Sequence, residues 1–240
     1  MEGAGIIEAN AERNEGRGSL EYLARHKPES SIAAWLDSDG AWKERDDVFI
    51  HYLDRKGKLR PGYGAKSTQI GPELGFGHVV GEHFDAPVLL IKLAWGGKSL
   101  AADFRPPSAG GHVGPYYTEL VTRTKELLAQ VGEQFPELAS HQPQLAGIGW
   151  HQGWNDRVNQ QFNDQYEQNL AHLIRDLRKE FAAPQLPFVI AETGMSGEGE
   201  THPRALSLMR AQAAVAEYEE FRGNVAFVGT KAFYRPAEDS

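Results

Sequence analysis

Residues 87–93 read Pro-Val-Leu-Leu-Ile-Lys-Leu, and this stretch decides the fold. From Val88 to Ile91 the apolar residues follow one another without alternating with polar ones. A strand that is covered on both faces shows this continuous pattern, which is typical of parallel sheets. We therefore expect a buried strand here. Similar short apolar runs predict four further strands, at Val48–Leu53, Leu145–Trp150, Pro187–Ala191 and Asn224–Val228.

Helical periodicity lies between those strands. Apolar residues at helical spacing predict one helix from Tyr117 to Val131, a longer one from Phe162 to Phe181, and a third after Pro203. Strands that alternate with helices of this length form βαβ units. The sequence therefore predicts the α/β class: a three-layer α/β/α fold with a mainly parallel sheet, as one domain over residues 1–240. Residues 12–27 are polar and predict a partly helical surface segment.

Composition excludes several classes of protein. The 240 residues are 40% hydrophobic and 24% charged, which is typical of a globular chain. The net charge of −8 argues against a nucleic-acid partner, because binding the phosphate backbone requires a basic face. The longest apolar run, residues 86–91, is too short to cross a membrane. The absence of cysteine excludes disulfides, thiolate metal sites and a cysteine nucleophile.

Familiar cofactor and hydrolase motifs are missing from the sequence. There is no G-x-S-x-G elbow, no P-loop and no H-E-x-x-H zinc motif, so we expect no metal and no cofactor. The glycines at 75, 77 and 81 follow no strand, so they predict a helix with small residues for close packing. Glu73 lies at the start of this helix, where a carboxylate interacts favourably with the helix dipole.

Three polar loops follow the predicted strands, at residues 95–99, 151–156 and 192–194. Parallel sheets place their chemistry at this carboxyl edge. Gly96 and Gly97 can expose backbone N–H groups, since glycine tolerates positive φ and has no side chain to block a substrate. With the Gln152 amide as a third donor, they would stabilise the oxyanion of an acyl-transfer intermediate. The alternative is an ordinary turn that Gln152 caps.

The motifs at residues 71–77, 95–100 and 150–156 resemble those of the sialate O-acetylesterase-like carbohydrate esterases, in the SGNH/GDSL hydrolase superfamily. The resemblance extends along the whole chain. It implies removal of O-acyl groups from a sugar or polysaccharide by a serine acyl-enzyme route without cofactor. It also implies that Gly96, Gly97 and Gln152 form the oxyanion hole, and that the partner is an acylated carbohydrate.

The resemblance also bears on the ends of the chain. Met1 aligns with the residue two places after the family's nucleophilic serine, and the family's catalytic histidine segment follows residue 240. We therefore expect the nucleophile, the base and an internal first strand to lie outside this chain. The chain alone is then expected to be unstable and inactive. No signal peptide is visible, and secretion or export to the periplasm would require a leader outside this sequence. The oligomeric state is left open.

Further residues of the loops are candidates for substrate binding. His151 predicts either a pocket residue or a core histidine bonded to a backbone carbonyl. Trp154 could present an aromatic face to a sugar, although packing is favoured. Arg105 could meet an anionic substrate group or pair on the surface. Asn155 and Asp156 are expected to fix their loop through local side-chain-to-backbone bonds.

Other functions are also consistent with these loops. Ser99, with His151 or His202 as base, could replace the missing nucleophile, although a turn-capping role is favoured. A non-catalytic carbohydrate-binding protein would use the same cleft. A glycosidase would use a pair of carboxylates such as Asp156 and Glu192, although a hydrogen bond at the sheet edge explains Glu192 as well.

Overall fold

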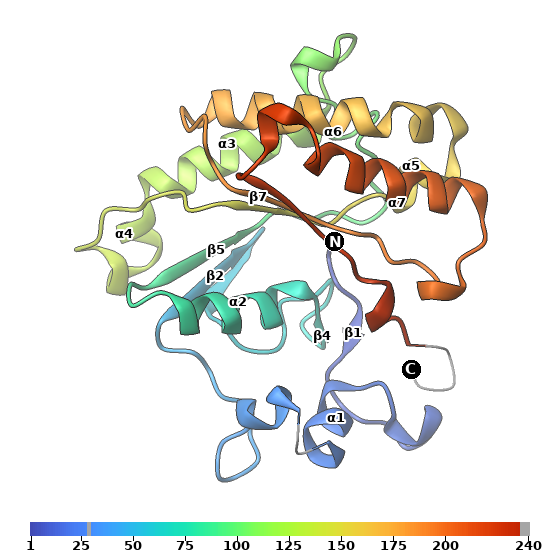
Figure 1. Ribbon diagram of the computed structural model, residues 1–240. Coiled ribbons are helices and arrows are strands. Elements are labelled where there is room, and N and C mark those ends of the chain that lie inside the picture. The colour runs from blue at the N-terminus through green and yellow to red at the C-terminus, as the bar shows by residue number, and fades with distance from the viewer. Residues whose placement is uncertain (28–29, 236–240) are drawn as a thin grey trace. The chain divides into compact units, whose positions relative to one another are not determined.

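The computed structural model describes residues 1–27 and 30–235 (Figure 1). The chain divides into two compact units. The first comprises residues 1–96 together with Arg235 among the described residues, and the second comprises residues 97–234. The expectation of a single domain stays a prediction.

The first unit is built on a small mixed sheet with the order β3-β2-β5. Strand β2 (Val48–Tyr52) runs parallel to β5 (Val88–Lys92) and antiparallel to β3 (Arg55–Lys58). Two short strands pair separately, β1 (Gly5–Ile6) with β4 (Gln69–Ile70). Helix α2 (Pro72–His83) packs on β2 and β5, and helix α1 (Leu20–His26) is capped by Ser19. Two 3-10 helices, η1 (Asn14–Gly16) and η2 (Ser31–Trp35), complete the unit.

Close packing explains the helical glycines Gly77 and Gly81, whereas Gly75 has open space at its Cβ position and the prediction of close packing was wrong there. A Cβ at Gly77 would overlap Leu59 Cδ2 and lie 2.9 Å from Leu90 Cδ1. Helix α2 can therefore approach the sheet only with glycine at this position, as the sequence predicted. The core beneath it consists of eight buried residues, Leu20, Val48, Ile50, Tyr52, Leu59, Tyr63, Leu74 and Ala94.

The strand predicted at residues 87–93 is observed as β5, but it is less buried than predicted. All five residues of β5 are only partly buried, whereas four of the five residues of β2 are buried. Among the described strands, β5 pairs only with β2, so it is an edge of its sheet. Although helix α2 packs on β5, no residue of this strand is fully buried, so the expectation of a fully buried strand was wrong here.

The second unit is an α/β unit around a parallel sheet with the order β6-β7-β8. The strands are β6 (Ile148–Trp150), β7 (Phe188–Ala191) and β8 (Val225–Val228), all within the predicted ranges. Helix α7 (Pro203–Ala216) packs on β7 and β8, and α6 (Gln160–Glu180) packs against α7 (Figure 1). The remaining helices are α3 (Pro115–Ala129), α4 (Val131–Gln134), α5 (Trp154–Val158) and the 3-10 helices η3 (Pro107–Ala109), η4 (Pro136–Leu138), η5 (Gly197–Gly199), η6 (Glu219–Phe221) and η7 (Lys231–Phe233).

The two faces of this parallel sheet differ. In β7, Phe188 and Ile190 are buried, while Val189 between them is 36% exposed. Val189 pairs in register with Gly149 and Ala226, which are also exposed. The predicted α/β class with parallel strands is confirmed, and one face of this sheet carries a row of small, solvent-exposed residues.

Candidate functional site

The candidate site lies at the carboxyl edge of the parallel sheet, where β6, β7 and β8 end. The segments that leave these strands are tied to one another by side chains. Gln212, fully buried on α7, donates from Nε2 to the carbonyl of Gln152 at 3.0 Å, and its Oε1 accepts from the N–H of Thr193 at 3.0 Å. The exits of β6 and β7 are therefore fastened to the same helix.

The turn at residues 97–101 has the conformation that the glycine predicted. Gly97 adopts φ +71°, a left-handed conformation that favours glycine. Its carbonyl accepts a hydrogen bond from Asn155 Nδ2. Ser99 is 3% exposed and donates from Oγ to Asp103 Oδ2 at 2.9 Å, and the Ala102 N–H donates to the same Oγ at 3.3 Å. Ser99 is therefore in the turn-capping role.

Asp156 is the centre of this arrangement. Its carboxylate is fully buried and accepts from the N–H groups of Leu100 at 2.8 Å and Ala101 at 2.9 Å. It also accepts from Gln152 Nε2 at 2.6 Å. Burial raises the pKa of Asp156, although these three hydrogen bonds act in the opposite direction. One carboxylate therefore joins the turn at 97–101 to the loop after β6.

This result corrects the expectation for Asn155 and Asp156. Both do fix a loop through side-chain-to-backbone bonds, but those bonds are not local. Their partners Gly97, Leu100 and Ala101 lie 55 to 58 positions away in the sequence. A pattern of neighbouring residues carries no information on such distant partners.

Both hydrogens of the Gln152 amide are engaged. Besides the bond to Asp156, Nε2 donates to the Lys98 carbonyl at 3.0 Å, so both amide hydrogens have acceptors. Its Oε1 is buried and has no partner among the described residues. Two acceptors on one side fix the orientation of the amide, because exchanging N and O would set oxygen against oxygen. In this structure the amide is held next to the turn, and its role as an oxyanion donor stays a prediction.

Gly96 belongs to the first unit, where the end of the Glu2 side chain lies against it. A Cβ at Gly96 would overlap Glu2 Oε2. After β6, Gly153 likewise lies against side chains, since its Cβ would lie 2.6 Å from Leu208 Cδ2 and 2.7 Å from Thr193 Cγ2. That Gly96, Gly97 and Gln152 converge on one oxyanion stays a prediction.

Of the two aromatic candidates, His151 is partly buried and Trp154 is exposed. Burial lowers the pKa of His151 to about 4, so its imidazole is neutral at pH 7. The Trp154 side chain is 58% exposed, and the Arg157 guanidinium lies 4.0 Å from its ring centre. The favoured packing role for Trp154 was wrong, because it lies in the first turn of a short surface helix. Its accessible indole is available to a ligand.

The side chains of Arg105 and His202 form hydrogen bonds with backbone groups. The Arg105 guanidinium donates to the carbonyls of Gly110 at 2.7 Å, Ala109 at 2.9 Å and Ala101 at 3.2 Å. It therefore fixes the loop at residues 101–110 instead of pairing with a surface carboxylate among the described residues. His202 Nδ1 accepts from the N–H of Arg204 at 3.2 Å and caps α7. Whether Arg105 contacts substrate stays a prediction.

Glu192 leaves β7 as a buried carboxylate. Its Oε2 accepts from the Thr230 N–H at 2.9 Å and the Lys231 N–H at 3.4 Å, and Lys231 Nζ lies 3.7 Å from Oε1. This is the sheet-edge hydrogen bonding that was one of the two expectations for Glu192. Like Asp156, Glu192 accepts hydrogen bonds from backbone N–H groups. This structural role accounts for both carboxylates without the glycosidase hypothesis.

Sequence reasoning missed two features near these loops. One is the pair Tyr166 and Gln212, which both donate to the Gln152 carbonyl, the tyrosine hydroxyl at 2.6 Å. The other is a serine–histidine contact, Ser108 Oγ to His172 Nδ1 at 2.7 Å. Asp176, one turn further on α6, accepts from the Ser108 N–H, so this carboxylate binds the serine backbone. The 3.6-residue period places His172 and Asp176 on one face, but nothing local pairs them with Ser108.

Residues 1–27 and 30–235 contain neither a cluster of metal ligands nor a membrane-spanning helix. No three histidine, aspartate or glutamate side chains there gather as metal ligands would. Nor does any helix of residues 1–27 and 30–235 have both the length and the apolar character needed to cross a bilayer.

Comparison with known proteins adds a family and a fold. Residues 1–234 match the family described as carbohydrate esterase, sialic acid-specific acetylesterase. A solved structure of an Arabidopsis thaliana protein is similar, with a TM-score of 0.62 and 18% identity over 84% of this chain and 79% of the other. A carbohydrate acetylesterase from Xanthomonas citri gives a TM-score of 0.57 and 14% identity over 90% of this chain and 48% of the other. No curated protein matches.

Proposed function

The chain belongs to the sialic acid-specific acetylesterase family of carbohydrate esterases, and from this membership we propose that it removes an acetyl or similar acyl group from a sugar. The proposed route is a serine acyl-enzyme. A serine hydroxyl adds to the ester carbonyl, the sugar leaves as an alcohol after protonation, and water then releases the acid. Each step passes through an oxyanion that needs fixed hydrogen-bond donors.

One observation carries this proposal: the Asp156 carboxylate holds the turn at 97–101 and the Gln152 amide next to each other. Donors that are fixed before the reaction need no reorganisation when charge develops, which is the main source of oxyanion stabilisation. Asp156 is fully buried and uses both oxygens on this task. We assign it as a positioning residue.

The same geometry defines how Gln152 would act. Its bond to Asp156 is 2.6 Å long and its bond to the Lys98 carbonyl is 3.0 Å long. Hydrogen bonds to an ionised carboxylate are roughly twice as strong as those to a neutral acceptor. We therefore propose that the oxyanion replaces the Lys98 carbonyl as an acceptor of Gln152 Nε2, while the bond to Asp156 keeps this nitrogen in place.

The test is hydrolysis of an O-acetylated sialic acid by a form of the protein extended at both ends to include the expected nucleophilic serine and histidine, with fluorophosphonate labelling to mark that serine. Gln152→Ala should lower kcat by about 10²–10³ and leave KM within about threefold. Gln160→Ala is the matched control, because Gln160 is exposed and bonds only to Asp164. A loss below about threefold in Gln152→Ala contradicts its role in the oxyanion hole.

A second candidate function is carbohydrate binding without hydrolysis, and the exposed Trp154 favours it. A sugar that stacks on this indole should change tryptophan fluorescence in the wild-type chain and not in Trp154→Ala. Sugar binding by the chain without turnover by the extended form would support this second function. Absence of both sugar binding by the chain and turnover by the extended form would reject both functions.

A further inference from the structure

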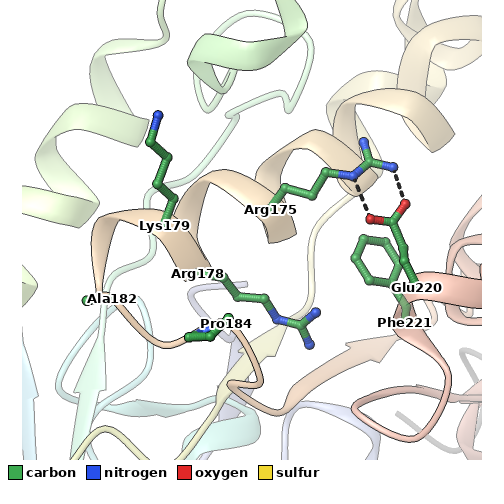
Figure 2. A pocket seen from close by; sticks show the side chains of 7 residues that line it. All are labelled: Arg175, Arg178, Lys179, Ala182, Pro184, Glu220 and Phe221. Carbon is green, nitrogen blue, oxygen red and sulfur yellow. Dashed lines mark hydrogen bonds and ion pairs between the residues drawn. The ribbon is translucent and has the colours of Figure 1, made fainter.

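The amino edge of the parallel sheet, opposite the candidate catalytic loops, carries a cavity of about 400 Å³. Its walls come from the last turns of α6, the connection to β7, and the segment before β8 (Figure 2). At about 3.3 Å per residue, the four residues of β7 set it roughly 13 Å from the carboxyl edge. The cavity is therefore separate from the loops discussed above.

The cavity is positively charged. Arg175, Arg178 and Lys179 line it, against a single carboxylate, Glu220. That carboxylate is already engaged, because Arg175 binds it through Nε at 3.0 Å and Nη2 at 2.5 Å, as the dashed lines in Figure 2 show. Arg175 and Glu220 neutralise each other, which leaves two cations without an opposite charge from the lining.

Arg178 is the unusual group. Its side chain extends from α6 toward the segment that carries Phe221 (Figure 2), and the residue is only 7% exposed. Nε and Nη2 donate to the Leu186 carbonyl at 3.1 and 2.9 Å, and Nη2 also donates to Asn224 Oδ1 at 2.7 Å. These acceptors are neutral, and no described carboxylate lies within ion-pair distance of this guanidinium. No described residue accepts a hydrogen bond from Nη1.

A buried guanidinium without a carboxylate is costly, and such charges in proteins are normally paired. The helix C-terminus offers partial compensation through its negative dipole. The Nη1 atom is not among the buried polar atoms that lack a partner, so solvent reaches it, and an anion in the cavity would replace that water. Lys179 lies at the rim as an exposed cation with no ion pair to a described residue.

We propose that this cavity binds a small oxyanion, the phosphate or carboxylate group of a small-molecule ligand, with Arg178 Nη1 as donor and Lys179 as the second positive charge. The apolar Pro184 and Phe221 confine the ligand at the sides. This site is independent of the proposed esterase function, since none of its residues belongs to the loops at the carboxyl edge.

The experiment is an NMR titration of the full chain at low ionic strength with inorganic phosphate in one arm and glucuronate in the other. Saturable shifts at the Arg178 side chain and at the amides of residues 179–184 support the proposal. The arm with the tighter affinity identifies the charged group. Chloride should weaken binding in either arm, because it competes as an anion and its salt screens the exposed Lys179.

Two variant pairs separate the site from general electrostatics. Glu220→Gln removes the one carboxylate among the described residues that line the cavity and frees Arg175, so affinity should rise about tenfold. Glu219→Gln makes the same change one residue earlier, where the side chain is 89% exposed and pairs with Arg222, and should alter affinity less than twofold. Lys179→Glu should weaken binding at least tenfold, whereas Lys66→Glu on the first unit should not.

None of these variants removes the hydrogen bonds of Arg178 to Leu186 and Asn224. A change in affinity therefore does not reflect the loss of those bonds. Equal effects of Glu220→Gln and Glu219→Gln would overturn the proposal. So would the absence of saturable shifts at residues 178–184 with both probes. Neither outcome depends on ester hydrolysis, so failure here leaves the proposed function unaffected.

Discussion

Replacing Asp156 with alanine tests the hydrogen-bond centre of the candidate site directly. The substitution leaves the N–H groups of Leu100 and Ala101 buried without an acceptor, since these two residues are 0% and 6% exposed. An unsatisfied buried donor costs about 1–3 kcal/mol, so the two together cost about 2–6 kcal/mol. Removing a desolvated carboxylate returns part of this cost. We expect a net loss of about 2–4 kcal/mol in the free energy of unfolding at pH 7.

The pH dependence of that loss follows from the direction of the pKa shift. Burial raises the pKa of Asp156 above its usual value of 3.8, so the folded state holds this proton more tightly than the unfolded state. Stability from the group is therefore fully present below about pH 4 and is lost as the pH rises through the raised value. The alanine side chain of the variant has no proton to bind or release in this pH range. The difference between wild type and Asp156→Ala should consequently be largest near pH 4 and smaller at pH 7.

The assay is urea unfolding followed by circular dichroism across this pH range. Asp164→Ala is the control, because Asp164 is exposed and accepts only from Gln160; its effect should stay within about 0.5 kcal/mol. A loss below about 0.5 kcal/mol in Asp156→Ala, or a loss that grows with pH, would contradict the assignment of Asp156 as a buried hydrogen-bond centre.

Three further predictions concern burial elsewhere. The Lys92 ammonium lies 2.7 Å from the Glu73 carboxylate, and 8% of the Lys92 side chain is exposed. Glu73→Ala leaves this buried charge unpaired and should lower the free energy of unfolding in urea by about 3–5 kcal/mol. The double variant with Lys92→Met should recover most of that loss. Gly77→Ala should destabilise by about 1–3 kcal/mol through overpacking, whereas Gly75→Ala on the same helix, with open space at its Cβ, should stabilise by up to about 1 kcal/mol; equal melting temperatures would contradict this. Burial lowers the pKa of His151 from 6.5 to about 4, so stability should rise with pH between those values, and His151→Gln should flatten that rise in acid unfolding.

The local elements could be predicted because each leaves a periodic trace in the sequence. The helix expected from Phe162 to Phe181 is observed as Gln160–Glu180, with its apolar stripe on the core side. Strand β3 was missed because Arg55-Lys-Gly-Lys58 has no apolar residue. It forms through antiparallel pairing with β2, and a charged sequence is how edge strands avoid further pairing. Its stability comes from a partner, which a window of four residues cannot reveal.

In the candidate site, too, local features could be predicted from the sequence and contacts between distant residues could not. Residue types and loop positions could be predicted, since glycines, amides and carboxylates gather after the strands. Their partners could not, because Gln212 reaches Gln152 across 60 positions and Asp156 reaches Leu100 across 56. A polar side chain is satisfied by whichever group the fold brings near it, so its partner depends on the tertiary structure. The assignment of Asp156 as a positioning residue therefore rests on the fold, and the loss expected in Asp156→Ala measures a contribution that no motif encodes.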